Sequence, residues 1–161
     1  MARRSPAKLV AELSPEERAF QKVARVVSIR EQSTATMRAK LAQAGFEEAV
    51  VEGALERARA CGFIDDRRYA EVLVRSAIAA GKGLRLVEQE LDALGVGLEE
   101  VQAYQEHCED GGDEVSRALD ALARKRFTAK NRWQAGYRFL VQRGYSNDAA
   151  SSAVRLWIES E

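Results

Sequence analysis

Leu41-Ala-Gln-Ala-Gly45-Phe46 recurs 50 residues later as Leu91-Asp-Ala-Leu-Gly95-Val96, and 49 residues after that as Leu140-Val-Gln-Arg-Gly144-Tyr145. Apolar positions upstream keep the same register: Phe20, Ala70 and Leu119 correspond, as do Val23, Leu73 and Leu122. The similarity lies in apolar spacing and in the glycine rather than in identity. A period of this length predicts three tandem copies of one structural unit.

Each copy is expected to hold three helices, because apolar residues recur at spacings of three and four. Ser14 and Ser33 are predicted N-caps, Pro15 suits a first helical turn, and Gly45 suits a helix end. Helices are predicted at about 14–30, 33–45 and 47–60, then from 65–66, after 81–83 and past Gly95 to near 109, and finally at about 114–127, 130–143 and 147–159. No segment has the pattern of a strand.

The predicted fold is therefore all-α, with three tandem three-helix repeats that form an elongated, curved, solenoid-like molecule. The predicted divisions are an N-terminal tail (1–13), repeat 1 (14–62), repeat 2 (63–110) and repeat 3 (111–161). Gly111-Gly112 is the clearest linker, with Asp113 as the cap that follows it.

The composition agrees with a helical, soluble protein of the cytoplasm. The 161 residues are 31% charged and 7% aromatic and include only two prolines, and no run of apolar residues is long enough to span a membrane or to serve as a secretory signal. Cys61 and Cys108 have no partner at ligand spacing and are interpreted as reduced packing residues. His107, the only histidine, is expected to be exposed or half-buried rather than a zinc ligand.

The net charge is zero, but it is unevenly distributed. Residues 1–61 hold 11 basic and 8 acidic side chains, residues 62–112 hold 5 and 11, and residues 113–161 hold 9 and 6. Between Arg124 and Arg143 there are seven basic residues and no acidic one, which favours contact with phosphates or with an acidic surface. Phe127, Trp133, Tyr137 and Phe139 lie in this run, and their helical spacing favours core packing over base stacking.

Other motifs have structural explanations. Asp65-Asp66 is a carboxylate pair at a helix start, where capping accounts for both residues without catalysis. Gly81-Lys82-Gly83 lacks the earlier glycine of a phosphate loop, because position 76 is Ser, and is predicted to be a loop between helices. No nucleophile has an orienting histidine. We therefore expect no catalytic residue, no cofactor and no metal.

Four segments, in matching order over about residues 18–158, resemble the RecX family of regulatory proteins. They are Arg30 to Leu41, Gly62-Phe-Ile-Asp-Asp-Arg-Arg-Tyr-Ala70, Gly81-Lys-Gly-Leu-Arg-Leu-Val-Glu-Gln-Glu-Leu91 and Tyr137-Arg-Phe-Leu-Val-Gln-Arg-Gly-Tyr-Ser146. The chain departs from the family pattern at Leu84, where proline is expected, at Gly136 inside a predicted helix, and in the glycine-rich linker, which leaves the orientation of repeat 3 undefined.

The resemblance implies a non-enzymatic monomer that binds the RecA–DNA filament and inhibits its recombinase, ATPase and coprotease activities, with roles in homologous recombination, DNA repair and the SOS response. DNA is then contacted weakly or through the filament. The alternative is a helical module whose main ligand is nucleic acid itself. The acidic middle of the chain favours the first hypothesis, because a partner surface of both protein and DNA suits mixed charge.

Sixteen basic residues are assigned to partner or nucleic-acid binding: Arg25, Arg30, Arg38, Lys40, Arg67, Arg68, Arg75, Lys82, Arg85, Arg124, Lys125, Arg126, Lys130, Arg132, Arg138 and Arg143.

Overall fold

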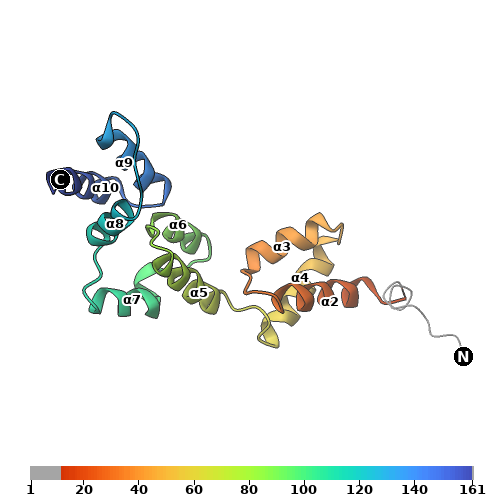
Figure 1. Cartoon of the computed structure of the whole chain (residues 1–161). Coiled ribbons are helices and arrows are strands. Elements are labelled where there is room, and N and C mark those ends of the chain that lie inside the picture. The colour runs from red at the N-terminus through yellow and green to blue at the C-terminus, as the bar shows by residue number, and fades with distance from the viewer. Residues whose placement is uncertain (1–11, 161) are drawn as a thin grey trace, which may run out of the picture. The chain divides into compact units, whose positions relative to one another are not determined.

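The computed structural model describes residues 12–160, and across this range the chain forms nine α-helices and one short 3₁₀ turn, with no strand (Figure 1). The prediction of an all-α repeat fold is confirmed. The chain divides into two compact units, the first ending at Tyr69 and the second beginning at Ala70.

The first unit contains α2 (Pro15–Val27), α3 (Thr34–Gln43) and α4 (Glu48–Ala60). The two predicted serine caps are confirmed, since the Ser14 side chain accepts a hydrogen bond from the Glu17 N–H and Ser33 accepts one from the Thr36 N–H. Each cap satisfies a backbone donor that the first helical turn leaves without a partner.

Helix α5 (Asp66–Ala79) begins beside this unit's core and continues into the second unit. The second unit then contains α6 (Arg85–Ala93), the 3₁₀ turn η1 (Leu98–Glu100) and α7 (Gln102–Glu109). The capping interpretation of the acidic pair is confirmed for Asp65, whose carboxylate accepts hydrogen bonds from the N–H groups of the two arginines that follow Asp66. Asp66 instead accepts the N–H of Thr34 at 2.7 Å, which ties the start of α5 to the start of α3.

The last three helices are α8 (Glu114–Ala123), α9 (Arg132–Gln142) and α10 (Asn147–Glu159). The prediction that α8 runs to residue 127 was wrong by one turn. The helix ends before Phe127, whose ring packs against the rings of Phe139 and Trp157, with 5.6 and 5.1 Å between ring centroids. Burial of this aromatic ring favours an extended segment between α8 and α9 over another helical turn.

The recurring leucine and glycine have the same structure in all three copies. Leu41, Leu91 and Leu140 are fully buried, each in a different apolar cluster. The glycine four residues later has a positive φ in each copy, between 70° and 89°. The residue after the glycine donates its N–H to the leucine carbonyl, at 3.3, 3.0 and 3.1 Å in chain order. This is the Schellman ending of a helix, and it explains why the leucine, the glycine and the next apolar residue recur together.

Gly83 forms a close backbone contact between the loop after α5 and the turn after α9, both of which lie in the second unit. Its N–H donates to the carbonyl of Arg143 at 3.0 Å, and the Arg85 N–H donates to the carbonyl of Gly144 at 3.0 Å. A side chain at Gly83 would overlap the backbone of Gly144. The predicted loop at 81–83 is confirmed, and its second glycine permits two backbones to touch.

Tyr145 also contacts the loop between α5 and α6. Its side chain is fully buried, and its hydroxyl donates to the carbonyl of Gly81 at 2.8 Å. Burial raises the pKa of this phenol, so the group keeps its proton and its role as a donor over the physiological pH range. The orientation of α8 to α10, which the glycine linker left undefined, is therefore set by contacts with the loop before α6.

Cys61 and Cys108 are free, as predicted, but the packing role predicted for them was wrong, because both are exposed. Gly136 lies buried within α9, where an added Cβ would come within 3.3 Å of side-chain atoms of Leu122, Val154 and Trp157. The glycine thus allows close packing of α8 and α10 on α9.

We expect the Gly83→Ala substitution to lower the free energy of unfolding of the second unit by about 1–3 kcal/mol, because the new methyl group must push two backbones apart. Both tryptophans, Trp133 and Trp157, lie in this unit, so urea unfolding followed by tryptophan fluorescence measures the effect. Gly97→Ala is the control: its φ is −72°, and its Cβ would meet only the mobile carboxylate ends of two glutamates. Equal stability of the two variants would contradict the assigned role of Gly83.

Candidate functional site

The basic residues predicted in the first unit are only partly available to a partner. Arg38 forms a bidentate hydrogen bond with Glu52, with 2.5 Å between Nε and Oε1, and Arg68 pairs with Glu31 at 2.6 Å. The hydrogen bond from Arg38 lowers the pKa of the Glu52 carboxyl. The remaining candidates are Arg25, Arg30 and Arg67, which are exposed, and Lys40, which is half-buried.

The candidates between α5 and α6 lie near acidic side chains or at the Gly83 junction. Arg75 is 3.8 Å from Glu106 on α7. Lys82 and Arg85 flank Gly83 and have exposed side chains, while their backbone groups take part in the junction: the Lys82 carbonyl accepts a hydrogen bond from Arg117, and the Arg85 N–H donates to Gly144.

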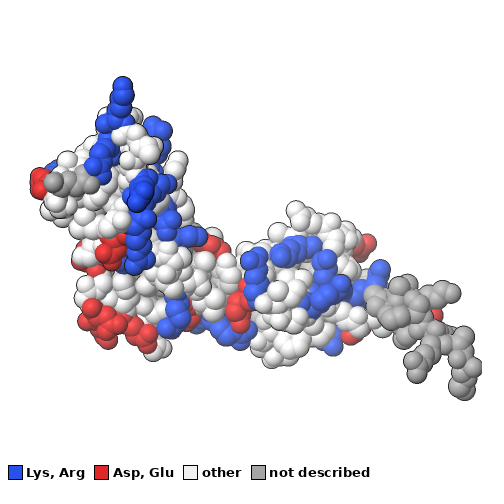
Figure 2. Space-filling view, in the orientation of Figure 1, with Lys and Arg blue, Asp and Glu red and all other residues white. Residues whose placement is uncertain are grey.

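The basic run from Arg124 to Arg143 divides into outward and inward side chains. Arg124, Lys125, Arg126, Lys130 and Arg138 are exposed, whereas Arg132 and Arg143 are half-buried. The Arg132 guanidinium lies 4.4 Å from the ring centre of Trp157. Figure 2 shows Lys and Arg side chains gathered over the part of the second unit that holds α8 and α9, while Asp and Glu gather over α7. Within residues 12–160, no ion pair is formed by Arg124, Arg126, Lys130 or Arg138.

The aromatic residues of this run mostly pack inward, as their spacing predicted. Phe127, Tyr137 and Phe139 lie against the cluster formed by α8, α9 and α10. Trp133 is the exception: it is 44% exposed and stacks on Tyr137 with 5.1 Å between ring centres. It offers the one flat, partly open indole face in the described part of the run.

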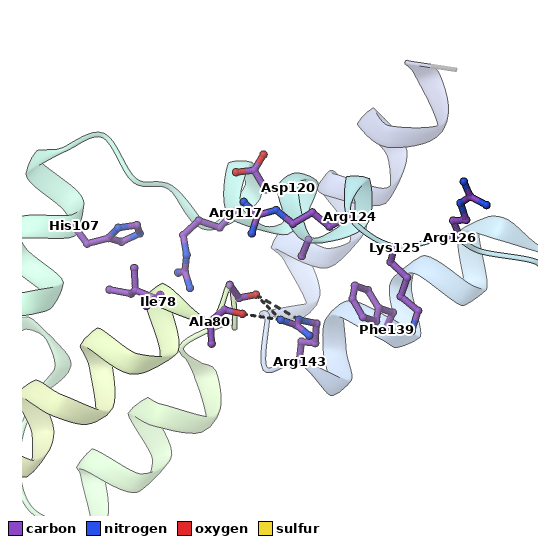
Figure 3. Close-up of a pocket in the computed structure, with 13 residues that line it drawn as sticks. Ile78, Ala80, His107, Arg117, Asp120, Arg124, Lys125, Arg126, Phe139 and Arg143 are labelled. Atoms are coloured by element: carbon purple, nitrogen blue, oxygen red, sulfur yellow. Dashed lines mark hydrogen bonds between the residues drawn. The ribbon is translucent and has the colours of Figure 1, made fainter. Parts of the chain in front are cut away.

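A cavity of about 600 Å³ lies beside the basic run, between the end of α5 and helices α7, α8 and α9 (Figure 3). Arg143 reaches across it and donates to the carbonyl of Ala80 at 2.8 Å, with a longer contact to the carbonyl of Gly81. Arg124 and Lys125 line it from the end of α8. Arg126 also lines it, so the structure brings four of the predicted residues to one recess, while Lys130, Arg132 and Arg138 lie outside its lining.

Two lining residues, His107 and Arg117, were not among the sequence candidates. Arg117 stands alone among acidic and apolar neighbours in the sequence, so no run of like charge marks it. His107 is half-buried, as predicted, and its ring lies where a side chain on Gly112 would otherwise stand. Burial lowers the pKa of the imidazole below its ordinary value of 6.5, and the positive charge of Arg117 lowers it further. The ring is therefore neutral at physiological pH.

No helix of the described residues is long and apolar enough to cross a membrane. The described part also contains no group of three or more His, Cys, Asp or Glu side chains placed to hold a metal ion.

The three-helix repeats of this chain match those of a family of helical regulatory proteins. The model of the first RecX three-helix domain matches residues 19–57, and the model of the second matches residues 65–103. "Regulatory protein RecX" of Mycobacterium sp. (strain JLS) is 32% identical, with 94% of this chain and 87% of the relative covered. The protein of the same name from Vibrio parahaemolyticus is 34% identical, with 88% and 90% covered. This chain belongs to the RecX family.

Solved structures show the same fold. The crystal structure of RecX from Lactobacillus salivarius matches with a TM-score of 0.62 at 14% identity, covering 90% of this chain and 97% of that one. A crystal structure of regulatory protein RecX matches with a TM-score of 0.63 at 22% identity, covering 96% of this chain and 75% of that one.

We expect the His107→Gln substitution to reduce the acid sensitivity of the second unit. Because the pKa of His107 is lower in the folded than in the unfolded chain, the unfolded chain binds more protons below pH 6.5, and stability falls as the pH drops through that value. The variant lacks this contribution. Urea unfolding followed by tryptophan fluorescence at several pH values between about 7.5 and 5.5 measures it. Other titrating groups are common to both proteins, so identical pH profiles would contradict the burial of His107.

Proposed function

We propose that this protein binds the RecA–DNA filament and inhibits its recombinase, ATPase and coprotease activities. It acts by binding rather than by catalysis, as a monomer in the cytoplasm, and its physiological setting is homologous recombination, DNA repair and the SOS response. The observation that carries the proposal is membership of the RecX family over nearly the whole chain, with relatives named as regulatory proteins.

The distribution of charge supports a partner that includes DNA. Arg126, Lys130 and Arg138 are exposed and form no ion pair in the described part of the chain, so their charges are available to phosphates. Arg38 and Arg68 already have carboxylate partners, and Arg143 holds backbone carbonyls. We therefore assign filament contact first to the exposed residues of the basic run, which lie between α8 and α9 and on α9 itself.

The acidic surface of α7 supports a partner that is more than nucleic acid. Duplex or single-stranded DNA repels carboxylates, and a protein that binds DNA alone gains from one continuous basic face. A filament of protein and DNA offers both signs of charge, so acidic and basic surfaces of the same unit can each find a complementary region.

Filament ATP hydrolysis tests the proposal directly. We expect the addition of this protein to RecA on single-stranded DNA to slow ATP hydrolysis at substoichiometric or near-stoichiometric amounts, because a ligand that contacts adjacent protomers affects more than one active site. A coupled assay of ADP release gives the rate. If the protein neither pulls down with RecA filaments nor changes their ATP turnover, the proposal fails.

A charge-removal variant tests which surface makes the contact. We expect Arg126→Gln, Lys130→Gln and Arg138→Gln together to weaken filament binding, and each lost contact with a single-strand phosphate to lower the slope of log affinity against log salt by about 0.7. The helical signal should remain, because Gln supports helices nearly as well as Arg or Lys. Fluorescence anisotropy at several salt concentrations measures both quantities.

The matched control removes three exposed charges elsewhere, Arg18→Gln, Arg59→Gln and Arg155→Gln. Equal loss of binding in both triple variants would show a general charge effect. Unchanged binding in the first variant would move the contact to Arg25, Arg30 and Lys40. Tight binding to naked DNA, with no preference for the filament, would favour the nucleic-acid module instead.

A further inference from the structure

The cavity between α5 and α8 is lined mainly by basic side chains, and only some of them hold backbone carbonyls. Five basic side chains line it, against the one carboxylate of Asp120: Arg117, Arg124, Lys125, Arg126 and Arg143. In the close-up their side chains come from α8, from the segment that follows it and from the end of α9, and Arg143 extends toward the end of α5 (Figure 3). Because His107 is neutral, the recess carries a net positive charge.

The end of α5 does not cancel this charge. A helix C-terminus presents carbonyl groups and a partial negative charge, which disfavours anions. Here Arg143 donates to the carbonyls of Ala80 and Gly81, and Arg117 donates to the carbonyl of Lys82. The carbonyls that follow α5 are thus covered by guanidinium groups. Arg124 and Lys125 at the rim hold charges that none of these carbonyls neutralises.

Two nitrogen atoms of the lining side chains have no hydrogen-bond partner in the described part of the chain. The Nε atom of Arg117 and the Nε2 atom of His107 are buried and have no hydrogen-bond partner among the described residues. An arginine Nε–H can only donate, and an imidazole nitrogen can donate in one of its neutral tautomers. Buried donors are nearly always satisfied in folded proteins, so an acceptor that enters the recess can pair with these atoms after a side-chain rotation.

We infer that this cavity binds a compact polyphosphate, of the class to which the triphosphate of a nucleotide belongs. Phosphate oxygens supply acceptors and negative charge together, and arginine holds them through paired, charge-assisted hydrogen bonds. A volume of about 600 Å³ suits a small ligand, since such sites usually span about 300–1,000 Å³. Ile78, Ala121 and Phe139 add an apolar wall against which the nucleoside part of a nucleotide can lie.

The shape of the site favours a small ligand over a nucleic-acid strand. Groups from α5, α7, α8 and the Arg143 end of α9 line the recess, so a terminal phosphate chain can reach cations from several elements at once. A strand bound along its backbone would rather follow the outer charges of Lys130 and Arg138, which lie outside the lining. The inference goes beyond the proposed function and does not depend on it, because the ligand binds without RecA.

Isothermal titration calorimetry on the full chain, in metal-free buffer of constant ionic strength, tests the inference. The probes are inorganic tripolyphosphate, ATP, adenosine and a short single-stranded oligonucleotide. We expect tripolyphosphate and ATP to bind at one site per chain and adenosine not to bind. Tighter binding of ATP than of tripolyphosphate would identify a nucleotide as the ligand, and equal binding would identify a polyphosphate of any source.

Matched variants locate the site. Arg124→Gln with Lys125→Gln should weaken tripolyphosphate binding by about tenfold or more, because two charge-assisted contacts are lost. Lys130→Gln with Arg138→Gln removes the same charge from outside the cavity and should change it by less than about twofold. Circular dichroism confirms that both variants fold. The inference is overturned if tripolyphosphate shows no saturable binding or if both variants weaken its binding equally. It is also overturned if only binding of the oligonucleotide, and not of tripolyphosphate, depends on Arg124 and Lys125.

Discussion

The contact between Gly83 and Gly144 is the constraint on which the second unit depends. Two backbone hydrogen bonds join the loop before α6 to the turn after α9, and the absence of a side chain at Gly83 allows them to form. Tyr145 and Arg143 then reach the carbonyls at the end of α5 from the same turn. This one close approach therefore sets where α8 and α9 lie, and with them the basic run and the cavity beside it.

The fold could largely be predicted from the sequence because its signals are local and repeated. Leu41, Leu91 and Leu140 recur with a glycine four residues later, and this pair is the local signature of one helix ending. Serine caps are local signals too. The end of α8 was missed because Phe127 is drawn to rings on α9 and α10, which no pattern within α8 reveals. The exposure of Cys61 and Cys108 likewise depends on neighbours distant in the sequence.

The candidate site could be predicted only in part. A run of like charge identifies Arg124 to Arg143, but it does not show that Arg143 turns inward to bind carbonyls or that Arg132 covers an indole ring. Arg117 and His107 lie at the cavity because α7 and α8 fold back beside α5, and neither residue belongs to a motif. Arg143 and Arg132 thus make contacts within the fold, whereas Arg124, Arg126 and Arg138 have exposed side chains.

Under the proposed function, the exposed part of the basic run faces the RecA–DNA filament. Hydrogen–deuterium exchange of this chain, free and bound to filaments, tests it most directly. Residues 124–131 lie between α8 and α9, so most of their amides lack helical hydrogen bonds and exchange quickly in the free protein. We expect the filament to slow exchange in this segment and in α9. Protection confined to the first unit, with residues 124–143 unchanged, would contradict it.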